Sequence, residues 1–245
     1  MQSFIDEKEL LNSSQYGFRK AHSTQHAIID IVNTIQTNMD KRLLSCGIFI
    51  DLKKAFDTVN HNILLQKLFH YGFRGIINQW FSSYLEGRTQ TTQIGSYVSN
   101  KAKINCGVPQ GSVLGPLLFL IYINDISYCS DKFQFYLFAD DTNLLYADKN
   151  LNSLESIVNQ ELENVYNWLT SNKLTLNIKK SNYVIFHPYQ KKFLSNPKYS
   201  SLIIQKKGKF PLKARNMLNI LEFLSIRICL GKTISITFQR KSVDP

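Results

Sequence analysis

Three aspartates stand where they could hold divalent cations. Asp51 closes an apolar run at residues 43–51 (LLSCGIFID), and Asp140 and Asp141 lie between two further apolar runs. Carboxylates are hard oxygen ligands that suit Mg²⁺, and a pair of such ions can activate an attacking oxygen and stabilise a leaving group in nucleotidyl transfer. Taken one at a time, however, Asp51 fits a solvated strand end, and Asp140 and Asp141 fit a polar turn.

The runs around these aspartates are typical of strands. The β-branched and aromatic content of residues 43–51 predicts a buried strand that ends at Asp51. Residues 133–139 and 142–147 predict two strands joined at the acidic dipeptide, and residues 183–186 predict another short strand. If these strands are neighbours in one sheet, the three carboxylates converge on a single rim.

Other segments predict helices and a hairpin. A break at Tyr71 and Gly72 separates two of the helices, and we expect Asp57 or Thr58 to cap the first of them. Residues 89–106 are rich in Thr, Val, Ile and Tyr and predict a hairpin. The helical spacing of apolar residues covers residues 63–68, 76–84, 113–126 and 151–169. This order of elements predicts an α+β fold with an antiparallel sheet at its centre.

The composition narrows the possible partners. Lys and Arg number 29 against 18 Asp and Glu, a net charge of +11 that favours a polyanion such as nucleic acid or an anionic membrane surface. The longest apolar run, residues 113–123, is well short of the ~20 residues that cross a bilayer, so no membrane span is predicted. The acidic residues among the first ten differ from a secretory signal, and we expect an intracellular protein.

Four sequence blocks resemble the reverse transcriptases of non-LTR retrotransposons, of the LINE and jockey-like kind, over roughly residues 15–186. The blocks occur in that family's order: QYGFR at 15–19 (fingers block), FIDLKKAFD at 49–57 (motif A), GVPQGSVLGPLLF at 107–119 (motif B) and FADDT at 138–142 (motif C). The long motif B is the most specific. Its wording argues against group II intron maturases and telomerase-like proteins, which share the palm.

The resemblance implies a reverse transcriptase palm, an antiparallel sheet packed on helices. It divides the chain into partial fingers at residues 1–42, a palm with motifs A to D at 43–187, and a basic, degenerate C-terminal segment at 188–245. The thumb is expected to be absent, and FLSI at 223–226 resembles an eroded primer grip. We therefore expect a fragment truncated at both ends, whose parent element acts in the nucleus and cytoplasm.

The resemblance also assigns the chemistry. LTLN at 174–177, followed by KKS at 179–181, resembles motif D. Catalysis would rest on Asp51, Asp140, Asp141 and Lys180, the last as the motif D general acid that protonates the departing pyrophosphate. Two Mg²⁺ ions, for which Mn²⁺ is a possible substitute, would bind the three aspartates and the backbone carbonyl of Leu52. For Lys180, a solvated basic turn is an alternative.

Further residues would bind the substrates. Phe56 matches a steric gate that would collide with a ribose 2′-OH, or else packs in the core. Gln110 and Gly111 match the loop that receives the nucleotide, where glycine leaves room for close backbone approach. Arg19 and Arg88 would contact nucleic-acid phosphates, or else are ordinary surface arginines.

The sequence thus predicts a fragment of an RNA-directed DNA polymerase. Its partners would be an RNA template, a DNA primer and deoxynucleoside triphosphates, without a membrane; no oligomeric state is predicted. The alternative is a catalytically inactive, nucleic-acid-binding remnant of such an enzyme.

Overall fold

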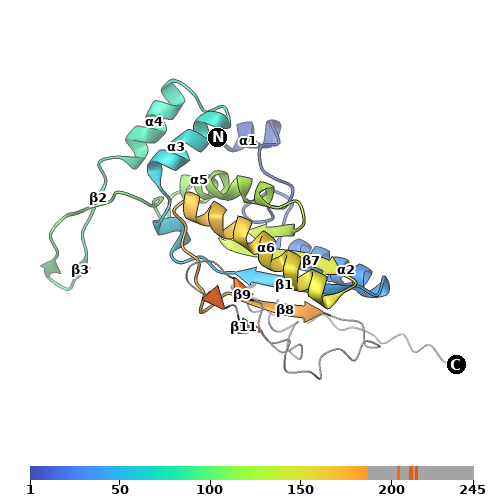
Figure 1. Ribbon diagram of the computed structural model, residues 1–245. Coiled ribbons are helices and arrows are strands. Elements are labelled where there is room, and N and C mark those ends of the chain that lie inside the picture. Colours follow the sequence, from blue (N-terminus) through green and yellow to red (C-terminus); the bar gives the residue numbers. More distant parts are fainter. Residues whose placement is uncertain (187–202, 205–209, 212, 215–245) are drawn as a thin grey trace.

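The computed structural model describes residues 1–186, 203–204, 210–211 and 213–214. Its centre is a five-stranded sheet in the order β11-β8-β1-β7-β6 (Figure 1). Neighbouring strands are antiparallel, except that β11 runs parallel to β8. The strands are β1 (Leu44–Ile50), β6 (Gln134–Phe138), β7 (Asp141–Asp148), β8 (Asn182–Phe186) and β11 (Lys213–Ala214). The predicted α+β fold with an antiparallel centre is confirmed.

Helices surround this sheet. They are α1 (Gln2–Glu7), α2 (Thr24–Asp40), α3 (His61–His70), α4 (Ile76–Leu85), α5 (Leu114–Ile123) and α6 (Leu151–Ser171), with 3-10 turns η1 (Ala55–Asp57) and η2 (Asn124–Cys129). Helices α3 to α6 lie where the apolar spacing predicted them. Helix α2 was not predicted; Ser23 caps it by accepting a hydrogen bond from the backbone N–H of His26.

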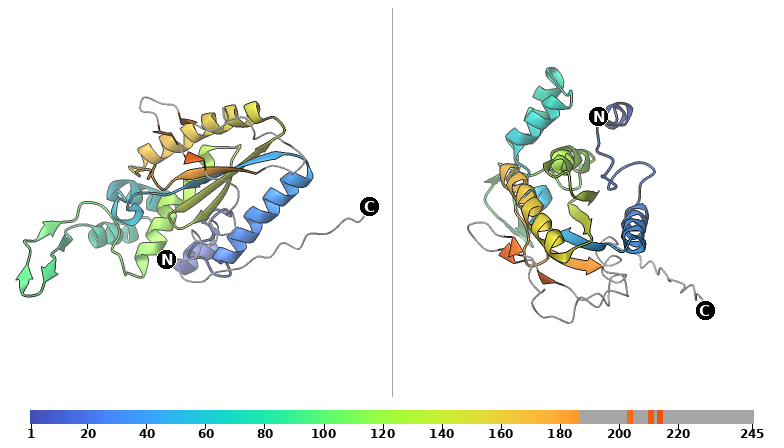
Figure 2. Two further views of the ribbon diagram at one scale, coloured as in Figure 1. Left: turned by 90° about the horizontal axis from the view of Figure 1, so that it is seen from below. Right: turned by 45° about the vertical axis from the view of Figure 1, so that its right-hand side comes forward.

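Both faces of the sheet are covered, because successive side chains of a strand point to opposite faces. Ile48 of β1 lies in the larger core beneath α5 and α6. The next residue, Phe49, packs on the other face against α2. Figure 2 shows the sheet between α6 and α2. Strand β1 is therefore buried along its whole length.

Helix α2 packs on the same sheet as motif A. The division between fingers and palm at residue 42 stays a prediction.

Helix α5 is a core helix. Each residue from Leu117 to Ile123 is buried. This agrees with the sequence of the helix, because a helix that is apolar on every face packs against other elements on all sides. In the described part of the chain, no helix combines the length and the apolar character needed to cross a membrane.

The start of α3 corrects one prediction. Neither Asp57 nor Thr58 caps this helix; Asn60 does, its side-chain oxygen accepting from the backbone N–H of Ile63 at 3.1 Å. The reason is that residues 55–57 form the separate turn η1, so α3 begins only at His61.

The predicted hairpin is formed by two short ladders. Strand β2 (Thr89–Gln90) pairs with β5 (Ala102–Lys103), and β3 (Gln93–Ile94) pairs with β4 (Tyr97–Val98). All four strands are exposed, and Figure 2 shows the hairpin extending away from the body of the molecule.

Part of the C-terminal segment is described. A two-stranded sheet joins β9 (Ile203–Ile204) to β10 (Phe210–Pro211), and β11 adds an edge to the main sheet. The primer-grip-like block at 223–226 lies outside the described residues.

Candidate active site

Motif C forms a tight hairpin between β6 and β7. Phe138 pairs with Asp141, so only Ala139 and Asp140 make the turn. Ala139 has a positive φ of 55°, which suits a two-residue hairpin but costs a non-glycine residue roughly 1–2 kcal/mol. The turn therefore presents Asp140 at its tip, and Asp141 begins β7.

The sheet register brings Asp51 to the same place. Ile50, the last residue of β1, pairs with Thr142 of β7. Continuing this register by one residue sets Asp51 opposite Asp141, and directly opposite residues of antiparallel strands share one face. The structure thus gathers the three aspartates at one rim of one sheet, called the carboxylate rim below.

The electrostatics of this rim fit a cation site. Burial raises the pKa of the half-buried Asp140, and repulsion from the Asp51 carboxylate raises it further, while a backbone hydrogen bond at Asp140 opposes both effects. Like charges disfavour each other's ionised form, so a divalent cation between them would stabilise the pair.

The donor set suits Mg²⁺ better than a closed, protein-only metal cage. Among the described residues, no three His, Cys, Asp or Glu side chains lie close enough together to hold a metal ion, so Asp51, Asp140 and Asp141 do not form a three-carboxylate site. Magnesium usually takes one or two carboxylates and completes its shell with water and substrate phosphates. Leu52 and Leu176 face each other in an antiparallel bridge. The backbone hydrogen bonds of this bridge are made by the residues on either side of Leu52, so the Leu52 carbonyl takes no part in it. Asp51, Asp140 and the Leu52 carbonyl therefore fit the ion.

Motif D holds Asp51 from the side. The Asn177 Nδ2 donates to Asp51 Oδ2 at 2.7 Å, and the Asp51 backbone N–H donates to the buried Ser181 Oγ at 3.1 Å. Sequence reasoning recognised both residues only as letters of motif D and missed this contact. Lys180, the predicted general acid, lies exposed in the same turn, its backbone N–H bonded to the Asn177 carbonyl at 3.1 Å.

The fingers block packs against motif C. Backbone bonds join Tyr16 and Ser14 to Leu137, each at 2.8 Å, so the block lines the edge of β6. A Cβ added at Gly17 would lie 2.5 Å from the backbone nitrogen of Ala139. Only glycine fits there. The glycine is visible in the sequence, but nothing in the sequence indicates which segment it approaches.

The two predicted phosphate-binding arginines differ in their surroundings. The Arg19 guanidinium donates to the carbonyls of Asn12 and Gln15 at 3.0 and 3.2 Å, and so stabilises the fingers loop. Arg88 is exposed at the base of the hairpin, 5.6 Å from the centre of the Tyr84 ring. Both roles in nucleic-acid binding stay predictions, and the exposed Arg88 is the more accessible of the two.

Motif B is docked onto the last residues of motif A. Val108 donates its backbone N–H to the Phe56 carbonyl at 2.9 Å, and Gln110 Nε2 donates to Asp57 Oδ1 at 2.7 Å. Asp57 therefore holds the motif B loop instead of capping α3. The Phe56 ring stacks on the fully buried Phe119, with ring centres 4.4 Å apart, which fixes the predicted gate in position.

The predicted nucleotide loop has room around it. Gly111 adopts a positive φ of 78°, and an added Cβ would meet nothing within 4 Å. Gln110 and Gly111 are both exposed, so a ligand can reach them.

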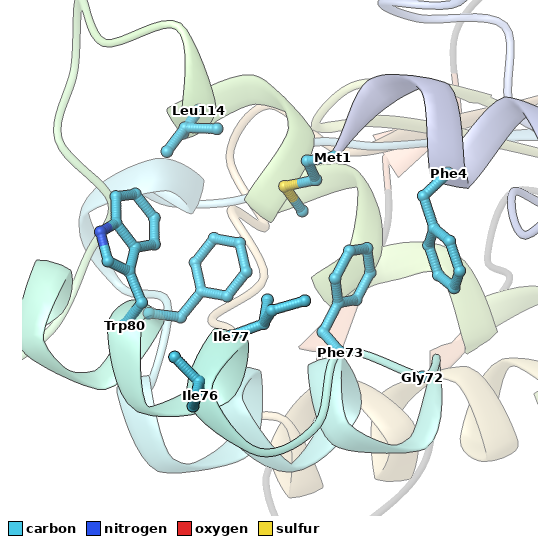
Figure 3. A pocket seen from close by; sticks show the side chains of 9 residues that line it. Met1, Phe4, Gly72, Phe73, Ile76, Ile77, Trp80 and Leu114 are labelled. Carbon is cyan, nitrogen blue, oxygen red and sulfur yellow. The ribbon is translucent and has the colours of Figure 1, made fainter.

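An apolar cavity of about 520 Å³ lies on another part of the molecule, between α1, α4 and the start of α5. Figure 3 shows Phe4, Phe73, Ile77 and Trp80 around it. It is lined by none of the predicted site residues and offers no group for catalysis.

A family model for "Reverse transcriptase (RNA-dependent DNA polymerase)" matches residues 1–214. The chain belongs to the reverse transcriptase family. Its relatives confirm the non-LTR kind. The chain is 30% identical over 191 residues to a probable RNA-directed DNA polymerase from transposon BS of Drosophila melanogaster, covering 74% of this chain and 21% of the relative. It is 30% identical over 179 residues to the polymerase of the mobile element jockey from the same species, covering 70% and 19%.

A more distant relative supports the same placement. The Pol polyprotein of the type-1 retrotransposable element R2 from Popillia japonica is 26% identical over 185 residues, covering 70% of this chain and 25% of the relative. This reverse transcriptase chain therefore spans about a fifth to a quarter of the length of these relatives.

Solved telomerase structures share the fold of this reverse transcriptase. Telomerase from Candida tropicalis with a fragment of telomeric RNA superposes with a TM-score of 0.55 at 14% identity, covering 75% of this chain and 33% of that one. A truncated apo form gives a TM-score of 0.54 at 16% identity, covering 78% and 40%. The predicted palm fold is confirmed.

Proposed function

We propose that this chain carries the polymerase centre of a non-LTR retrotransposon, which copies an RNA template into DNA from a DNA primer. The observation that carries the proposal is the carboxylate rim: Asp51 follows β1 beside the turn that bears Asp140 and Asp141, in a chain of the reverse transcriptase family. Two-metal nucleotidyl transfer requires such an arrangement.

The residues of the carboxylate rim would have different roles in catalysis. Asp51 and Asp140, with the Leu52 carbonyl, would hold two Mg²⁺ ions, or Mn²⁺, and Asp141 would lie beside the primer terminus. When bound, the ions activate the primer 3′-hydroxyl and neutralise charge on the triphosphate. The primer 3′-hydroxyl would lose its proton to solvent water, its oxygen would bond to the α-phosphorus, and the bond to the leaving pyrophosphate would break. Lys180 would donate a proton to this leaving group.

Substrate selection would fall to motifs A and B. The Phe56 ring, held by its stack on Phe119, would exclude a 2′-hydroxyl and so select deoxynucleoside triphosphates. Gln110 and Gly111 would receive the nucleotide in the open loop beside Asp57. Arg88, and Arg19 if its loop bonds rearrange, would contact phosphates of the template and primer.

Primer extension on poly(rA) with oligo(dT) and dTTP tests the proposal. The wild-type chain should extend the primer in the presence of Mg²⁺. The double variant Asp140→Ala, Asp141→Ala should lose roughly 100-fold or more in rate, since several kcal/mol of charge stabilisation disappear. Asp131→Ala, in the exposed turn before β6, is the matched control and should keep the rate.

Two results would reject the proposal that this chain is an active polymerase. One is RNA–DNA binding by gel shift without Mg²⁺-dependent extension, which favours the alternative of a nucleic-acid-binding remnant. The other is extension that survives in the double variant, because the synthesis would then come from elsewhere.

A further inference from the structure

Asn177 contacts Asp51 at two points. Its side-chain amide donates to Asp51 Oδ2 at 2.7 Å, and its backbone N–H donates to the Asp51 carbonyl at 2.8 Å. Asp51 is the first residue after the end of β1. The two hydrogen bonds from motif D therefore hold the chain at the predicted metal ligand, directly after the strand ends.

Asn177 is itself held firmly. Its carbonyl accepts from the backbone N–H groups of Lys180 at 3.1 Å and Ser181 at 2.9 Å. The preceding residue, Leu176, is buried and bridges to Leu52. The amide is thus fixed by a closed turn on one side and by the core on the other, so it can set the orientation of the Asp51 carboxylate.

The chemistry of the donor matters as well. The terminal torsion of an aspartate is broad, so a free carboxylate at a strand end samples many orientations. A hydrogen bond to the carboxylate restricts this torsion. A neutral amide does so without the positive charge of Lys or Arg, which would repel a cation.

We infer that Asn177 is a positioning residue, whose amide orients the Asp51 carboxylate for a divalent cation at the carboxylate rim. The inference rests on the proposed function in one respect, that Asp51 is a metal ligand. Hydrogen-bond partners of metal ligands typically govern affinity by about 10–100-fold.

Mn²⁺ binding to the full chain tests the inference without turnover. Free Mn²⁺ is measured by electron paramagnetic resonance during titration of the wild type, Asp51→Ala, Asn177→Ala and Asn177→Ser, whose shorter hydroxyl falls short of the carboxylate. Both Asn177 variants should bind Mn²⁺ roughly 10-fold more weakly than wild type. Thermal unfolding of each metal-free variant reports whether it is folded.

Asn172→Ala is the matched control. Asn172 is a buried asparagine in the same connection between α6 and β8, and its side chain donates to the Trp168 carbonyl at 2.9 Å. Its truncation removes an amide hydrogen bond without touching Asp51. Asn172→Ala should lower the unfolding temperature yet bind Mn²⁺ within about twofold of wild type.

The outcomes separate this inference from the proposed function. Mn²⁺ affinities of the Asn177 variants equal to that of Asn172→Ala would overturn it, and so would wild-type binding that does not depend on Asp51. If Mn²⁺ binding depends on Asp51 and Asn177 while wild type extends no primer, the inference stands and the proposed activity fails.

Discussion

The carboxylate rim and the outer lobe, defined as residues 76–103 with α4 and the hairpin, are built in opposite ways. At the rim, segments far apart in sequence meet: the fingers block at Gly17, motif A at Asp51, motif C at Ala139 and motif D at Asn177. In the outer lobe, the exposed side chains contact their sequence neighbours, as in the stack of Trp80 on Tyr84 with ring centres 5.4 Å apart, while Phe81 and Leu85 of α4 pack into the core. Large apolar side chains remain exposed there, among them Ile76 and Tyr97 at 83% each.

This difference predicts where the molecule tolerates change. A side chain at the rim is positioned by contacts from several elements, so one substitution displaces groups that must converge within a few ångströms. An exposed side chain of the outer lobe contacts mainly its sequence neighbours. Matched substitutions in the two regions should therefore differ in their effect on function more than on folding.

The largest effect is expected from Gly17→Ala. The new methyl would lie 2.5 Å from the Ala139 nitrogen, so either the fingers block or the motif C turn must shift. We expect the free energy of unfolding to fall by roughly 1–3 kcal/mol and primer extension to be lost. Urea unfolding and the extension assay measure the two effects.

The outer lobe supplies the control for this change. Gly95→Ala meets nothing within 4 Å, although its φ of 61° costs roughly 1–2 kcal/mol. It should lose stability and keep extension. Equal rates of extension in the two variants would remove the distinction between the regions.

Phe119→Leu should act next most strongly. The smaller side chain removes the stack beneath Phe56, so the gate gains freedom and ribonucleotide incorporation should rise severalfold, with a loss of about 1 kcal/mol of stability. The ratio of dTTP to UTP incorporation measures the gate. Phe81→Leu, at a buried site of the outer lobe, should cost similar stability and leave this ratio unchanged. A changed ratio in both variants would contradict the assignment.

Gln110→Ala should affect substrate binding more than folding. Its bond to Asp57 is exposed, so unfolding should change by at most about 1 kcal/mol, while the KM for dTTP should rise severalfold. In the outer lobe, Gln93→Ala removes a comparable exposed bond, to the Gly95 carbonyl at 3.0 Å. Its KM should match wild type, and a parallel rise in both would indicate a nonspecific effect.

The smallest effect is expected from Tyr97→Ala at the hairpin tip. With 83% of the side chain exposed, the substitution should change the free energy of unfolding by no more than about 0.5 kcal/mol. Extension should also be unchanged. A loss of several degrees in Tm would show that the tip packs more tightly than its exposure indicates.

Periodicity predicted the elements better than their contacts. The strand before Asp51, the motif C hairpin and helices α3 to α6 follow directly from apolar spacing. Helix α2 was missed although Ile28, Ile31 and Ile35 have helical spacing, because the segment was interpreted only through its motif.

The contacts that shape the site carry no periodic signal. The hydrogen bond from Asn177 to Asp51 joins residues that are 126 positions apart in the sequence. Both are ordinary polar residue types that are also common in turns. The cap of α3 was misassigned because Asp57, Thr58 and Asn60 are all good capping types, and only the turn η1 decides between them. Convergence at the rim could be inferred from motif order, but its hydrogen bonds required the fold.

Anomalous diffraction at the manganese edge tests the central claim most directly. Crystals of the full chain, soaked with MnCl₂ and dTTP, should show Mn²⁺ within about 2.0–2.6 Å of carboxylate oxygens from both Asp51 and Asp140. Mn²⁺ bound only at other acidic residues, with the rim free of it, would contradict the account.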